Sequence, residues 1–71
     1  MKLTQENVDK MTIDDLLKHL VANAKAAAAL GKNPDVHLFI IEEHNHNVEL
    51  IKKQIKDRFD KMEKLLASVK S

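Results

Sequence analysis

The sequence predicts an all-α fold in which two long helices form an antiparallel hairpin. Its 71 residues contain one glycine and one proline, and both lie in the stretch LGKNPD, residues 30–35. Alanine, leucine, lysine, glutamate and isoleucine dominate the composition, as is typical of long helices. Apolar residues recur at steps of three and four on both sides of that stretch. We therefore expect a single helical-hairpin domain over residues 1–71.

The first predicted element is a short helical turn at about residues 4–10, and the first long helix follows at about residues 12–31. The long helix begins at Thr12 because the sequence TIDD can form a capping box, in which the threonine side chain binds a backbone N–H of the first turn. Its apolar stripe consists of Ile13, Leu17, Leu20, Ala24 and Ala27.

A tight connection of about two to four residues is expected between the two long helices. Gly31 suits the left-handed conformation that often ends a helix. Asn33 can cap the next helix, and Pro34 suits its first position. The second long helix is therefore predicted at about residues 34–69, roughly 50 Å long at 1.5 Å per residue.

One stripe of the second long helix is the predicted interaction face. Its members keep helical spacing along almost the whole element. They are Ile41, His44, Val48, Ile51, Ile55, Phe59, Met62, Leu66 and Val69. The stretch EEHNHN is rich in weak helix formers, so a loop at residues 44–47 is the alternative. Because the stripe stays in phase across these residues, we favour a continuous helix.

Charges along the chain support the hairpin and suggest how it assembles. Residues 34–50 contain four acids and no lysine or arginine, whereas residues 51–71 contain seven bases and three acids. If the chain folds back at residues 32–33, residue i lies level with residue 65 − i, and Lys18 and Lys25 lie beside the acidic half. The acidic half of one long helix can also face the basic half of another.

The long second helix extends beyond the first by roughly 16 residues and carries apolar side chains that the first cannot cover. We therefore expect a homodimer, assembled as an antiparallel four-helix bundle through the interaction face. A helix of a different protein in the same position is the alternative partner.

Catalysis, cofactors and a metal site are not expected. The chain has no cysteine or tyrosine and no glycine-rich phosphate loop. Glu43 and His46 match the Glu-x-x-His spacing of di-iron bundles. At 100° per residue, however, both side chains point away from the predicted seam between the helices, and the first long helix offers no glutamate. His44 and His46 point about 200° apart on a helix and cannot share an ion.

His44 is the one polar member of the interaction face. A polar residue in an apolar seam can fix the register of two helices. Histidine also changes its charge between pH 5 and 8, so we expect that protonation of His44 would loosen the assembly.

The predicted function is that of a small, non-enzymatic interaction or regulatory protein. The alternative is a nucleic-acid-associated regulatory hairpin that uses the basic half of the second helix, with contacts from Lys52, Lys53, Lys56 and Lys64. Nucleic acid is the less favoured partner because Asp57 and Asp60 alternate with these lysines at four-residue spacing. The apolar runs AAAAL and LFII are too short to span a membrane, and no secretory signal is seen, so we expect a cytoplasmic protein.

Overall fold

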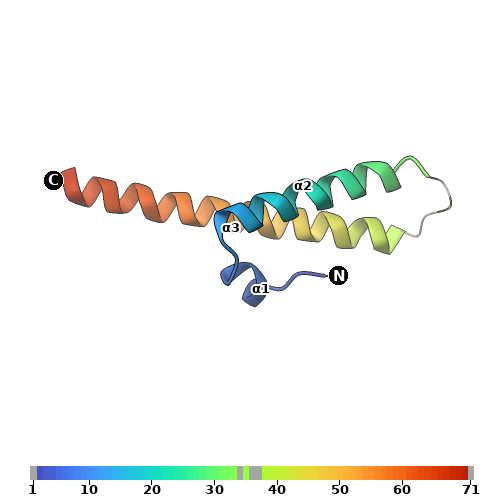
Figure 1. Ribbon diagram of the computed structural model, residues 1–71, viewed down its shortest axis with the longest axis horizontal. Helices are drawn as coiled ribbons and strands as arrows, with labels where there is room; N and C mark the ends of the chain where they lie inside the picture. Colours follow the sequence, from blue (N-terminus) through green and yellow to red (C-terminus); the bar gives the residue numbers. More distant parts are fainter. Residues whose placement is uncertain (1, 34, 36–37, 71) are drawn as a thin grey trace.

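The computed structural model describes residues 2–33, 35 and 38–70, with the backbone alone at residue 70. All regular structure in these residues is helical: α1 is Gln5–Asp9, α2 is Ile13–Leu30 and α3 is Leu38–Lys70. α2 and α3 run side by side in opposite directions, and α1 packs against α3 near the beginning of α2 (Figure 1). The predicted all-α fold, with two long helices packed together, is therefore confirmed.

The short helix α1 is stabilised by a complete capping box. Thr4 Oγ1 accepts a hydrogen bond from the Asn7 backbone N–H at 3.2 Å, and Asn7 Oδ1 accepts one from the Thr4 N–H at 3.0 Å. Val8, in the same turn, is fully buried. The structure confirms the predicted helical turn near residues 4–10.

α2 begins and ends within one residue of the predicted limits. Thr12 has extended backbone angles, and its Oγ1 accepts a hydrogen bond from the Asp15 N–H at 3.1 Å. This bond satisfies one of the backbone N–H groups that the first turn of a helix leaves without a partner.

Replacing Thr12 by alanine is expected to lower the free energy of unfolding by about 1 kcal/mol, because the cap bond at the beginning of α2 is lost. Thr12→Ser keeps the hydroxyl and should behave almost as the wild type. Urea titrations followed by circular dichroism measure both variants. Equal stability of the alanine and serine variants would contradict the role of this cap.

The connection between the long helices differs from the prediction. Gly31 is in the right-handed region, with φ −62° and ψ −19°, so the expected left-handed cap is wrong. Instead, the last turn of α2 tightens: the Lys32 N–H donates to Ala29 O at 3.3 Å and the Asn33 N–H to Leu30 O at 3.0 Å. These i→i−3 bonds satisfy terminal carbonyl groups without a left-handed residue.

α3 begins at Leu38, later than the predicted residue 34. Asp35 lies in a turn, where its N–H donates to the Asn33 side chain at 3.0 Å. The predicted place of Pro34 at the first helical position lies outside the described residues, as do residues 36 and 37.

The later beginning of α3 changes the register of the hairpin. Asn23 of α2 is bonded to His44 and Asn47 of α3, so residue i lies opposite about residue 68 − i rather than 65 − i. The ion pairs found among the described residues join residues three or four positions apart in the sequence, Lys10–Glu6 at 3.3 Å and Lys52–Glu49 at 3.7 Å. The expected pairing of Lys18 and Lys25 with the acidic half of α3 is not found among the ion pairs of the described residues.

The buried core combines the residues before α2, here named the N-terminal segment (residues 2–12), with both long helices. Its apolar members are Leu3, Val8, Leu16 and Ile51. Partly buried side chains of Met11, Ile13, Leu20, Leu50 and Ile55 pack around them. Two of these four buried apolar residues precede α2, so the N-terminal segment contributes to the core. α3 continues without a break through residues 44–47, which excludes the loop alternative.

Candidate interaction surface

The structure divides the predicted interaction face into a covered part and an exposed part. Ile51 is fully buried, and the members from residue 41 to residue 55 that surround it are half-buried in the hairpin. The members beyond residue 55 are exposed. Phe59 is 53%, Met62 46%, Leu66 60% and Val69 83% exposed, and Leu65 beside them is 67% exposed.

The division follows from the unequal lengths of the helices. The first residue of α2, Ile13, lies level with about residue 55 of α3, so α2 covers nothing beyond that point. α1 extends the cover only to Arg58, whose guanidinium donates to the backbone oxygens of Val8 at 3.1 Å and Asp9 at 3.4 Å. Residues 59–69, here named the α3 overhang, project beyond the rest of the molecule (Figure 1).

A polar cluster lies inside the covered half. Asn23 Oδ1 of α2 accepts hydrogen bonds from Asn47 Nδ2 at 3.0 Å and from His44 Nδ1 at 2.9 Å, both on α3. The Asn23 amide donates to the backbone oxygen of His19 at 2.7 Å. Asn47 is 2% and Asn23 9% exposed, so these bonds compensate for the cost of burying two amides.

This cluster corrects the sequence-based interpretation of the HNHN stretch, in which His44 alone faced the seam. Asn47 is the more deeply buried residue, and its partner Asn23 was not singled out at all. The sequence could indicate that Asn23 lies near the inner face of its helix, because it follows Leu20 of the predicted stripe by three residues and precedes Ala27 by four, but it could not indicate the partners of Asn23 on the other helix.

The other side of Asn47 holds the N-terminal segment. Asn47 Oδ1 accepts a hydrogen bond from the Leu3 N–H at 2.8 Å, and His46 Nε2 donates to the Leu3 carbonyl oxygen at 3.1 Å. His46 is exposed, as the sequence predicts, but it also binds the backbone. Sequence patterns gave no indication that the HNHN stretch contacts residue 3, which lies 43 and 44 positions away.

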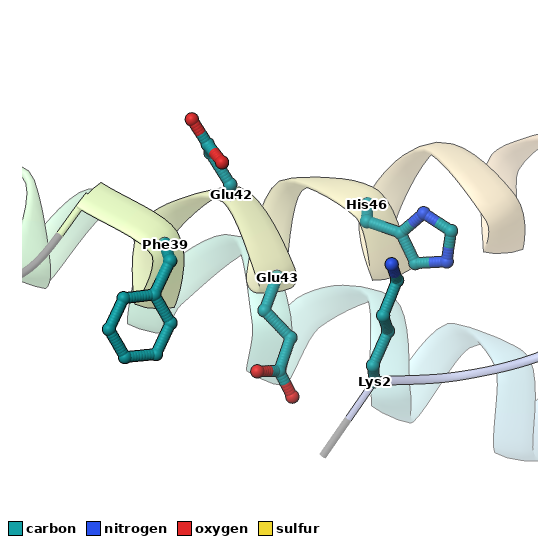
Figure 2. A pocket seen from close by; sticks show the side chains of 5 residues that line it. All are labelled: Lys2, Phe39, Glu42, Glu43 and His46. Carbon is teal, nitrogen blue, oxygen red and sulfur yellow. The ribbon is translucent and has the colours of Figure 1, made fainter.

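The Glu43-x-x-His46 motif lines an open hollow between α3 and the N-terminal segment, together with Lys2, Phe39 and Glu42. Figure 2 shows the Lys2 ammonium group beside the His46 ring, while Glu42 points to the opposite side from Glu43. Within the described part of the chain, no group of three or more His, Cys, Asp or Glu side chains could hold a metal ion. The hollow is open to solvent.

The basic half of α3 presents the lysines of the nucleic-acid alternative to solvent. Lys52, Lys53, Lys56 and Lys64 are all exposed. Lys52 pairs with Glu49, and the single arginine of the chain, Arg58, binds backbone oxygens at the end of α1.

Comparison of the chain with protein-family models, curated proteins and solved structures found no match. Among the described residues, no helix has both the length and the apolar character needed to cross a membrane.

Proposed function

We propose that the protein is a non-enzymatic helical interaction module that pairs with a second copy of itself through the α3 overhang. The observation that supports this is the exposure of five large apolar side chains on one stripe, between 46% and 83% each. A contiguous apolar patch of this kind is unusual on a monomer and commonly marks a protein interaction site.

The overhang suits a weak, concentration-dependent pairing. Full burial of a large apolar side chain contributes about 1.5–3 kcal/mol, so covering what these five side chains expose on both copies contributes about 9–18 kcal/mol. Association itself costs about 4–15 kcal/mol in lost freedom of motion. The two quantities are of similar size, which favours a dimer that forms in the micromolar to millimolar range.

An antiparallel arrangement of two overhangs pairs their apolar residues well. With the copies offset so that Met62 of one lies level with Leu66 of the other, Phe59 lies level with Val69. The overhang contains Asp60, Lys61, Glu63 and Lys64, so its net charge is zero and the two copies do not repel each other through their total charge. Because α2 already covers the acidic half of α3, this contact is smaller than a full four-helix bundle.

Sedimentation of Leu66→Asp tests the proposal, because the substitution places a charge in the middle of the overhang stripe. The wild type should approach the mass of two chains as its concentration rises, and Leu66→Asp should remain at one. Ala67→Asp is the matched control, since residue 67 is also exposed but points about 100° further round the helix. A wild type that stays monomeric, or a Leu66→Asp variant that still dimerises, would overturn the proposal.

A further inference from the structure

α3 binds the N-terminal segment chiefly through backbone groups and two apolar anchors. The side chains of Asn47 and His46 bind the N–H and the carbonyl oxygen of Leu3, at 2.8 Å and 3.1 Å. The Leu3 side chain itself is 3% exposed. Hydrogen bonds to a peptide backbone supply affinity for any sequence, and a side-chain pocket supplies selectivity.

After Leu3 the bound segment turns, and a second apolar side chain, that of Val8, is buried. The Thr4–Asn7 capping box begins α1 immediately after the extended residue Thr4, and this turn directs Val8 into the core, where it is fully buried. Arg58 binds the Val8 carbonyl oxygen at 3.1 Å. The segment therefore presents the pattern Leu-Thr-x-x-Asn-Val to α3.

The surface of α3 that contacts the N-terminal segment has features of a groove that could stay folded after this segment is released. Only three residues, Lys10–Thr12, join α1 to α2, and none of them is helical. Asn47 is also bonded to Asn23 of α2, and this bond holds its side chain from the other side. The groups of α3 that bind the segment are side chains, which water can satisfy after release.

We propose that His46, Asn47, Gln54 and Arg58 form a peptide-binding site, and that residues 3–8 occupy it as a replaceable ligand. Gln54 belongs to the site because its Oε1 accepts a hydrogen bond from Gln5 at 3.0 Å. The ligand that fits is the same segment from a second copy of this chain. This site lies before the overhang on α3, and the proposal does not depend on the pairing of overhangs.

A labelled peptide of residues 2–11 tests the site by fluorescence anisotropy. The receptor is the full-length chain carrying Leu3→Asp alone, which removes the first apolar anchor of its own segment and keeps Val8 in the core. This receptor should bind the peptide at least tenfold more tightly than the wild type, whose site is filled. A peptide with Leu3→Asp is the matched control and should not bind. If the receptor remains helical and binds neither peptide, or binds both equally, the proposal is wrong.

Hydrogen exchange on the wild-type chain supplies a second measurement that needs no variant. The amides of Val8 and Met11 are bonded to Thr4 O and Val8 O, both at 3.2 Å. If the segment leaves its groove while the hairpin stays folded, these amides should exchange at least tenfold faster than the amide of Ile51 in the covered half of α3. Exchange at the same rate would show that the segment leaves only on global unfolding, and would overturn the proposal.

Discussion

Replacing Asn47 by alanine is expected to lower the free energy of unfolding by about 2–4 kcal/mol. The substitution leaves the buried Leu3 N–H without its acceptor, at a cost of about 1–3 kcal/mol, and it opens a small cavity in the seam. It also removes the donor to Asn23 Oδ1. A core in a chain of this size supplies only about 3–5 kcal/mol, so Asn47→Ala should populate the unfolded state strongly at room temperature. Thermal and urea unfolding measure the loss.

Two further variants separate the role of Asn47 from that of asparagine in general. Asn45→Ala changes an exposed residue two positions earlier and should alter stability by less than about 0.5 kcal/mol. In a double-mutant cycle, Asn23→Ala combined with Asn47→Ala should cost less than the sum of the single variants, because both remove the same hydrogen bond. Equal stability of the residue 45 and residue 47 variants would show that the polar cluster stabilises nothing.

The beginnings of α1 and α2 were predictable because the signals that begin these two helices are local. Thr4 and Thr12 each bind a backbone N–H three residues ahead, and the sequence within four residues suffices to recognise both caps. The exposed overhang was predictable for a similar reason. α2 has 18 residues and α3 has 33, and this difference in length alone leaves the end of α3 without a neighbour.

The polar cluster was not predictable, because it depends on the register between the helices. With the predicted turn at residues 32–33, Asn23 lies level with Glu42. Its observed hydrogen bonds place Asn23 level with residue 45 instead, between His44 and Asn47. A shift of three residues along one helix thus decides whether an asparagine meets a carboxylate or another amide. The turn sequence GKNPD, residues 31–35, does not reveal how many residues the connection needs.

The position of the N-terminal segment was also beyond sequence patterns. Its apolar residues, Leu3 and Val8, are too few to define a helical stripe, and α1 is only five residues long. What holds the segment is a set of contacts from α3, including those of Asn47 and Arg58 to backbone groups. Backbone groups are the same at every residue, so such contacts leave no signature in the sequence of the segment they hold.

Ile51→Ala and Leu66→Ala should differ strongly in their effect on the free energy of unfolding, although both residues belong to one predicted stripe. Ile51 is fully buried, and its truncation should lower the free energy of unfolding by about 2–4 kcal/mol through lost burial and a cavity. Leu66 is 60% exposed, and its truncation should change the stability of the monomer by less than about 0.5 kcal/mol. Urea unfolding at low protein concentration, where pairing is absent, measures both.

When association is measured instead of stability, Leu66→Ala should have the larger effect of the two variants. Sedimentation at high concentration should show weaker pairing for Leu66→Ala, whereas the folded fraction of Ile51→Ala should pair as the wild type does, because residue 51 lies beneath α2 and the N-terminal segment. Ile51→Val, which keeps the shape of the side chain and removes one methyl group, should cost only about 1 kcal/mol and leave pairing unchanged. If Leu66→Ala destabilises the dilute monomer as much as Ile51→Ala does, the overhang belongs to the core and cannot serve as a surface for a second copy.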